Sequence, residues 1–253
     1  MIMIPDFLHK IKSLLEKRKL ETVRIKASPI EQGEKISITQ SKFLGRPFLP
    51  LNQEYPKDKF GNPMILLAQI NFEEVPPIKG YPISGILQIF TSIPFWHLGN
   101  EYFLYLYHEN KKQPYHENFP DFSKDDYNEF PISSEHKLTF LKESDYGGLT
   151  DIRTSNDDNK RLLEFCETLP EQEQNKLQKL LRSDGHKIGG YAYFTQQDLR
   201  AFQSDKKNHL LLLQIDTDKK IMFGDAGISN IFISEVDLVN RAFDKAYFNW
   251  DCA

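Results

Sequence analysis

Two apolar runs, ILLAQINF (residues 65–72) and LLLLQIDT (residues 210–217), each carry a glutamine at the fifth position. Short apolar runs bounded by turn residues are typical of strands buried on both faces. A glutamine amide left unpaired in a core costs roughly 1 to 3 kcal/mol, so Gln69 and Gln214 must each have a hydrogen-bond partner. Because the pattern recurs about 145 residues later, we expect a structure that is built twice.

The internal repeat extends beyond the two glutamines. Shifts of 145 and then 142 residues align further identical positions in the same order: Lys42 with Lys187, Gly45 with Gly190, Leu66 with Leu211, Leu67 with Leu212, Ile70 with Ile215, Gly85 with Gly227, Ile86 with Ile228, Ile89 with Ile231, and Phe90 with Phe232. Each half should therefore contain a glycine turn, a strand with a central glutamine, a second glycine turn and an Ile/Phe strand. The segments FLYLYHE and YFNWDCA are expected to close the two units.

Periodicity predicts the remaining elements. An amphipathic helix is expected over residues 7–15 and should dock on the protein's own sheet. Two helices on either side of Pro170, over residues 159–168 and 171–182, should form a hairpin between the halves. Strands are expected at residues 22–27, 36–39, 65–72, 84–91, 102–108, 136–143, 210–217, 228–234 and 245–252.

The predicted fold class is α+β and mainly β. It is a roll-like duplicated β unit with pseudo-twofold halves, an N-terminal helix and a helical hairpin in the connection. We expect a single domain over residues 1–253, with internal repeats at about 41–108 and 186–252. Each repeat would cover the apolar face of the other.

Composition narrows the classes of partner. The formal net charge of −4 supplies no basic field for a phosphate backbone, so nucleic acid is not expected as a partner. No stretch of 18 apolar residues occurs, so a membrane is not expected either. The two cysteines, Cys166 and Cys252, form no metal or disulfide pattern, which favours a cytoplasmic location.

The motifs SKFLGRPFLP, PMILLAQINFEEVP and YPISGILQIF, followed later by HKIGGY, HLLLLQIDTD and FGDAGISNIFIS, resemble the bacterial YwqG-like family, a domain of unknown function. The resemblance covers nearly the whole chain from Ser41 to Cys252. It implies a largely β, roll-like α+β domain with two similar halves. It implies no established activity.

Local motifs give no mechanism. The chain has no G-x-G-x-x-G, P-loop, H-E-x-x-H or G-x-S-x-G sequence, and neither cysteine has a nearby histidine. We therefore assign no catalytic residue, no metal site and no cofactor. Whether the protein is an enzyme is uncertain from sequence, and the evidence leans against it.

The leading functional hypothesis is a binding or protein-interaction domain. An unknown small polar ligand or a protein partner would meet a groove between the repeats, where amides and cations orient it and aromatic rings cover it. The candidate ligand-binding residues are Arg46, Gln69, Trp96, His97, Lys187, Gln214 and Asp225. For the two glutamines the recurrence favours a structural role, in which each latches a strand to loop backbone within its own half.

Two alternatives remain. A hydrolase would use Asp225 as base and His97 as its partner, which requires the two side chains to lie within hydrogen-bond reach in an open cleft. An immunity-type partner of a toxin would instead use the acidic, aromatic segment at residues 115–130 as its contact surface. That segment is long and has no clear periodicity, which is typical of functional loops.

Overall fold

The computed structural model of the chain describes residues 4–31, 33–123, 125–128 and 130–253. The described strands are β1 (Leu20–Pro29), β2 (Lys42–Phe43), β3 (Ile65–Asn71), β4 (Ile86–Thr91), β5 (Phe103–His108), β6 (His136–Asp145), β7 (Lys187–Gly189), β8 (Leu210–Ile215), β9 (Ile228–Ile233) and β10 (Tyr247–Asp251). The α-helices are α1 (Lys12–Arg18), α2 (Asn156–Glu167), α3 (Glu171–Leu180) and α4 (Glu235–Val239). The protein is therefore mainly β with some helices, as the sequence predicts.

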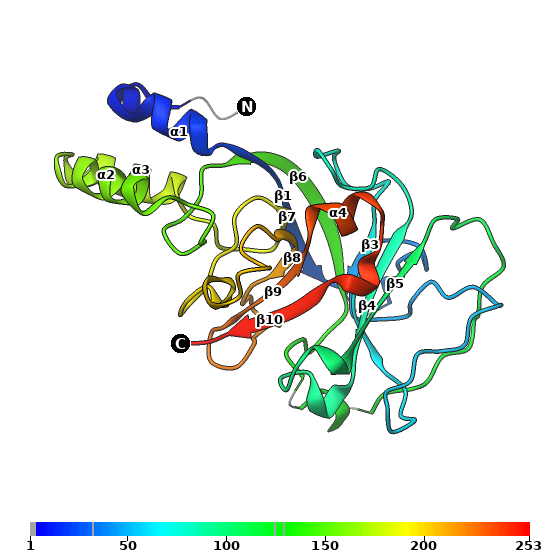
Figure 1. Cartoon of the computed structure of the whole chain (residues 1–253). Coiled ribbons are helices and arrows are strands. Elements are labelled where there is room, and N and C mark those ends of the chain that lie inside the picture. Colours follow the sequence, from blue (N-terminus) through cyan, green and yellow to red (C-terminus); the bar gives the residue numbers. More distant parts are fainter. Residues whose placement is uncertain (1–3, 32, 124, 129) are drawn as a thin grey trace.

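All the strands belong to one antiparallel sheet, in the order β10-β9-β8-β7-β1-β6-β2-β3-β4-β5. The long strands β1 and β6 pair along their full length at the centre. From this centre β2 to β5 run outward on one side, and β7 to β10 run outward in the same sequence on the other. The order thus reads alike from both ends, and Figure 1 shows the two sides curving around a common interior.

The register repeats as well. Lys42 of β2 lies opposite Gln69 of β3, and Lys187 of β7 lies opposite Gln214 of β8. In β3 the pairing with β4 shifts between Leu66 and Ala68, and in β8 the pairing with β9 shifts at the corresponding place, between Leu211 and Leu213. An irregularity at the same point of both units bends both strands in the same way.

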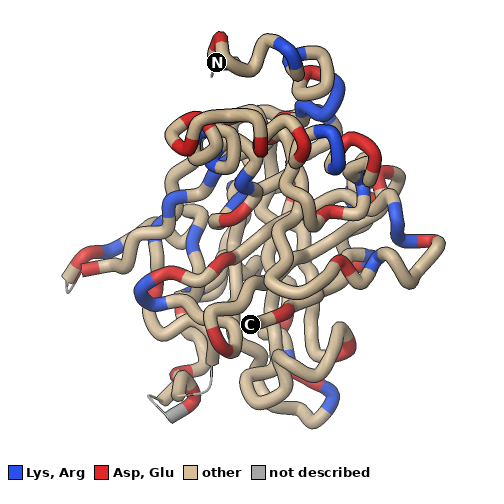
Figure 2. Tube along the Cα trace, turned by 90° about the vertical axis from the view of Figure 1, so that its left-hand side faces the viewer, with Lys and Arg blue, Asp and Glu red and all other residues tan. Residues whose placement is uncertain are grey.

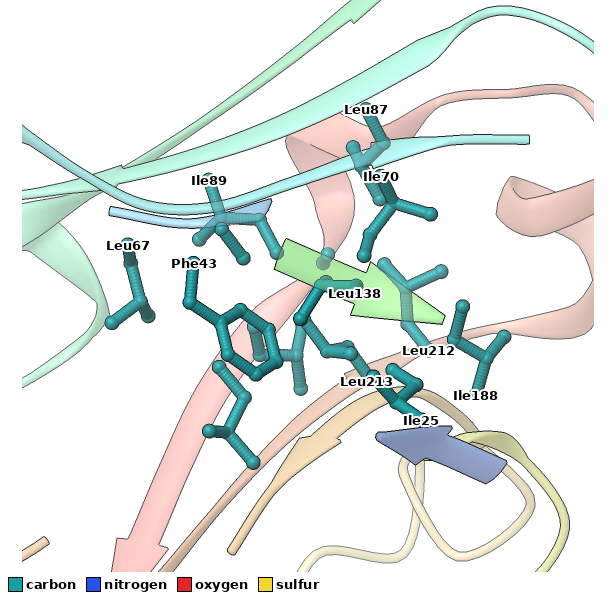
Figure 3. Packing of buried hydrophobic residues seen from close by; sticks show 14 of the residues in the cluster. Ile25, Phe43, Leu67, Ile70, Leu87, Ile89, Leu138, Ile188, Leu212 and Leu213 are labelled. Atoms are coloured by element: carbon teal, nitrogen blue, oxygen red, sulfur yellow. The ribbon is translucent and has the colours of Figure 1, made fainter. Parts of the chain in front are cut away.

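One hydrophobic core joins the two sides of the sheet. Figure 3 shows Phe43, Ile89 and Leu138 packed toward Leu212 and Ile188 from the opposite side. Strands β3, β4, β8 and β9 are buried along nearly their whole length, which explains their near-continuous apolar runs. Each side therefore buries the apolar face of the other.

The sheet is nearly closed because its two edge strands meet. The ring of Phe103 in β5 stacks on that of Phe248 in β10, with 4.1 Å between the ring centroids. Asn100, just before β5, accepts a hydrogen bond from the backbone N–H of Phe248 at 3.0 Å. We call this meeting of β5 and β10 the seam.

The N-terminal helix packs elsewhere than expected. It starts as a 3-10 helix (Asp6–Ile11), continues as α1, and buries Leu8 and Leu15 against Leu162 and Leu177 of the α2/α3 hairpin. The prediction of docking on the sheet was wrong, because the apolar side of the helix packs with Leu162 and Leu177 of the hairpin and with Tyr146. Figure 1 shows α1, α2 and α3 together at one end of the molecule.

Two further observations complete the fold. Residues 36–39, expected as a strand, form no ladder within the described part of the chain, and the Ile38 carbonyl bonds a side chain instead. No helix among the described residues is both long and apolar enough to cross a membrane. On the side shown in Figure 2, acidic and basic residues are interspersed along the chain.

Candidate functional site

Gln69 is fully buried, and its amide fastens a loop to β3. The Nε2 group donates to the carbonyls of Ile38 and Gln40, both at 2.8 Å. The Oε1 atom accepts from the backbone N–H of Phe48 at 2.8 Å and from Nε2 of Gln88 at 2.7 Å. Both N–H donors and both lone pairs of this amide are used inside the protein.

Gln214 makes the same contacts in the other half. Its Nε2 donates to the carbonyls of Ser183 at 2.9 Å and Gly185 at 2.7 Å, and its Oε1 accepts from the backbone N–H of Tyr193 at 2.9 Å. Each partner stands 145 residues after its counterpart in the first half. Both amides bond backbone of their own half, as the latch interpretation predicts. We call them the Gln69 latch and the Gln214 latch.

The neighbouring strand adds a second amide to each latch, and here the halves differ. Gln88 donates to the Phe48 carbonyl at 2.6 Å, and Asn230 donates to the Tyr193 carbonyl at 2.8 Å. The Oε1 of Gln88 is within 2.9 Å of His108 Nε2. The Oδ1 of Asn230 is buried and has no hydrogen-bond partner among the described residues. Because Asn230 is shorter than Gln88, the second latch keeps an acceptor without a partner among the described residues.

The two repeated lysines are both buried, and burial lowers the pKa of each to about 8. Lys42 donates to the carbonyls of Ser37 and Arg46. Lys187 pairs with Asp145 at 2.8 Å. Burial alone would raise the pKa of Asp145, but the charge and hydrogen bond of Lys187 bring it below its usual value. Lys187 is thus enclosed in an ion pair.

Arg46 is exposed and lies apart from the other candidate residues. It lines a cavity of about 200 Å³ together with Tyr55, Phe119 and Tyr127. The last two rings belong to the acidic, aromatic segment at residues 115–130, in which Lys124 and Glu129 lie outside the described residues. This segment therefore packs part of its aromatic surface against the first half.

Trp96, His97 and Asp225 lie along the seam. The Trp96 ring contacts those of Trp250 and Phe223, with centroid distances of 5.0 and 5.7 Å. The His97 carbonyl accepts from Trp250 Nε1 at 3.1 Å. The carbonyl of exposed Asp225 accepts from the backbone N–H of the last residue. These contacts fix where β10 and the chain end lie.

The structure thus distributes the seven candidate residues over four places. Gln69 and Gln214 form the latches, Lys187 is in the buried ion pair with Asp145, Arg46 is in its own cavity, and the other three are at the seam. Within the described part of the chain, no hydrogen bond or ion pair joins the side chains of His97 and Asp225. The contact on which the hydrolase alternative depends is not made.

A second cavity, of about 230 Å³, opens at the seam. Asn100 reaches it from the first half, while β9, β10 and the segment before β8 supply the rest. Its lining residues are Asn100, Phe194, Asp198, Leu199, Arg200, Gln203, Lys206, Phe232, Tyr247, Phe248 and Asn249. We call it the seam cavity.

Two lining side chains bring polar atoms that have no partner. The Tyr247 hydroxyl and the Asn249 Nδ2 are buried, and neither has a hydrogen-bond partner among the described residues. The corresponding positions of β5 are Leu104 and Leu106, since these lie opposite Phe90 and Gln88 as Tyr247 and Asn249 lie opposite Phe232 and Asn230. In the first half those leucines pack in an apolar cluster. The same fold position is apolar in one half and polar in the other.

The cations beside the seam cavity differ in their pairing. Arg200 donates to both oxygens of Asp198 at 2.9 and 2.6 Å and pairs with Asp151 at 3.0 Å. Lys206 holds its ammonium 4.3 Å from the centroid of the Tyr247 ring and makes no ion pair within the described residues. Lys206 therefore supplies positive charge that no carboxylate of the described chain neutralises.

Sequence reasoning missed Tyr247, Asn249 and Lys206 as site residues. The sequence repeat gave no register for the closing strands, and only their pairing with β4 and β9 places Tyr247 and Asn249 at the positions of Leu104 and Leu106. That the new polar groups lack partners depends on their three-dimensional surroundings. Lys206 lies outside the repeat motifs altogether.

A comparison with models of protein families gives a match. A family model described as "Domain of unknown function (DUF1963)" matches residues 41–252, which take in both sides of the sheet and the helical hairpin between them. No curated protein matches the chain.

The Gln69 latch can be tested by stability. Gln69→Leu leaves three backbone groups without their partner, so we expect the free energy of unfolding to fall by about 3 kcal/mol, and Gln214→Leu should cost a similar amount. Urea denaturation measures both. Gln172→Leu, at an exposed position of α3, serves as control. A change below about 0.5 kcal/mol in both latch variants, the size usual for surface substitutions, would show that the amides are dispensable.

His108 should make stability depend on pH. Burial lowers its pKa from 6.5 to about 4, so the unfolded chain binds a proton in this range that the folded protein does not. The free energy of unfolding should therefore fall as the pH drops from 6.5 toward 4. With solvent screening allowed for, wild type should lose about 1 to 2 kcal/mol more than His108→Gln, which keeps a donor for Gln88.

The measurement is urea denaturation at a series of pH values. His9→Gln, at an exposed histidine of the N-terminal helix, is the matched control and should follow the wild-type curve. Parallel curves for wild type and His108→Gln would contradict the assignment.

Proposed function

The chain belongs to the DUF1963 family, a domain of unknown function, and we propose that it is a binding domain whose small polar ligand occupies the seam cavity. This places the ligand at the groove between the repeats, where β10 of one half meets Asn100 and β5 of the other. The observation that carries the proposal is the pair of unpartnered polar atoms on Tyr247 and Asn249.

The cost of these atoms supports a binding role. A buried donor without a partner destabilises a protein by roughly 1 to 3 kcal/mol. Leu104 and Leu106 show that the same positions of the fold accept apolar residues without this cost. A site whose residues lower the stability of a protein is commonly one that performs a function.

The proposal includes an account of the fold. The two halves, at about residues 41–108 and 186–252, are copies of one unit within a single domain over residues 1–253, and the chain is a YwqG-like member of its family. The strand order that reads alike from both ends, the repeated shift in β3 and β8, and the repeated latches all support duplication. A roll with pseudo-twofold halves follows from two such units sharing a core.

The other expectations from the sequence remain proposals. Arg46 stays a candidate ligand contact because it lines an aromatic cavity, and a toxin-binding role for residues 115–130 stays a prediction. Trp96, His97 and Asp225 are proposed to hold β10 in place along the seam. Cys166 and Cys252 are free thiols, in keeping with the proposed cytoplasmic location in a bacterium.

The double variant Tyr247→Phe/Asn249→Leu tests the binding role. Removal of two unpartnered groups should raise the free energy of unfolding of the ligand-free protein by about 1 to 3 kcal/mol. The same change should abolish binding of those members of a panel of small polar metabolites that bind wild type, followed by ligand-observed NMR. Urea denaturation gives the stability arm.

Thr91→Val is the matched control, because the Thr91 hydroxyl is also buried and unpartnered but lies outside the lining of the seam cavity. It should gain stability and keep binding. The proposal fails if no panel member binds wild type, or if the double variant binds as well as wild type does.

A further inference from the structure

We propose that the ligand of the seam cavity is a small organic carboxylate anion. The inference rests on the proposed function, and it adds the chemical class of the ligand. It is drawn from the hydrogen-bonding groups, the charge and the walls of the cavity.

Three groups of the lining can donate hydrogen bonds that no described residue accepts. Asn249 Nδ2 can only donate, and the Lys206 ammonium has three N–H bonds and no acceptor. Burial raises the pKa of Tyr247 above its usual value, so its hydroxyl stays protonated and able to donate at neutral pH. A ligand that satisfies all three groups must present acceptor atoms, and a carboxylate presents two oxygens that only accept.

The charge around the cavity selects an anion. Its lining contains one carboxylate, Asp198, and two cations, Arg200 and Lys206. Asp198 is held by Arg200 and by the backbone N–H of Ile152 at 3.0 Å. Arg200 also pairs with Asp151 and donates a hydrogen bond to the His209 carbonyl. Lys206 is left as the unpaired charge of the lining, which carries a net charge of +1, and Asp151 outside the lining is also paired with Arg153.

The walls select an organic anion over a bare inorganic one. Phe194, Phe232 and Phe248 line the cavity beside the donors and offer apolar surface to a hydrocarbon body. The volume of about 230 Å³ lies below the roughly 300 to 1,000 Å³ of pockets for drug-sized ligands. A compact acid with one carboxylate and a short apolar body matches donors, charge and walls together.

The comparison of the halves supports the location of the site. In the first half the Gln88 side chain bonds that of His108, and Leu104 and Leu106 of the edge strand β5 pack in an apolar cluster. In the second half the Asn230 Oδ1 has no partner among the described residues, and Tyr247 and Asn249 stand in place of the leucines. Polar groups without partners therefore lie in the second half at positions that the first half fills with its own side chains.

The experiment titrates the full chain with acetate, propionate, succinate and glutarate, each beside its uncharged amide, at constant ionic strength set with sodium chloride. Two-dimensional ¹H–¹⁵N NMR follows the Asn249 side-chain amide, which reports on this cavity. Carboxylates should shift the Asn249 signal and bind at least about tenfold more tightly than their amides, because a hydrogen bond to a charged group contributes about 1.5 to 3 kcal/mol.

Lys206→Met should weaken carboxylate binding by at least about tenfold, on the same reasoning. Lys207→Met, at the adjacent exposed lysine, removes the same charge outside the cavity lining and should leave the affinity unchanged.

Three outcomes overturn the inference. If amides bind as tightly as carboxylates, or Lys206→Met and Lys207→Met behave alike, the ligand class is wrong while the cavity remains a binding site. If inorganic phosphate shifts the Asn249 signal and the organic acids do not, the apolar walls play no part in recognition. If no probe shifts that signal, the inference and the proposed function both fail.

Discussion

A buried glutamine amide must be satisfied, and this constraint organises both halves of the protein. Gln69 and Gln214 stand in the middle of apolar strands, where water is absent, so loop backbone has to come to them. The Oε1 of Gln214 accepts a hydrogen bond from the Tyr193 N–H, and the Nδ2 of Asn230 donates one to the Tyr193 carbonyl. The chain that follows Tyr193 carries Phe194, Arg200 and Lys206, so the second latch also places one wall of the seam cavity.

The two halves share a scaffold but differ in how completely they satisfy it. In the first half, side-chain hydrogen bonds join Gln69 to Gln88 and Gln88 to His108. The second half has Asn230 in place of Gln88, and a side chain one methylene shorter leaves an acceptor without a partner. Under the proposed duplication, the closed half contributes stability and the open half is the one in which the proposed binding can develop.

Much of the scaffold was predictable because it depends on local pattern. The recurrence of the glutamine, the glycine turns and the Ile/Phe strands predicted the repeated unit, and the latch followed from the cost of a buried amide. The two-residue strand β2 and the three-residue strand β7 were missed, since so short a pairing has no period to detect. The site was harder: Lys187 looked available in sequence, but Asp145, from a distant strand, neutralises it in the core. The missing partners of Tyr247 and Asn249 are likewise a property of the folded chain.

Amide hydrogen exchange at Phe48 and Tyr193 tests the latch account most directly. Both residues lie outside the strands, and each N–H is held by the oxygen of a buried glutamine. The account predicts that both amides exchange as slowly as those of the core strands β3 and β8, with opening free energies near that of global unfolding. Exchange at the rate of exposed loops, at either residue, would contradict it.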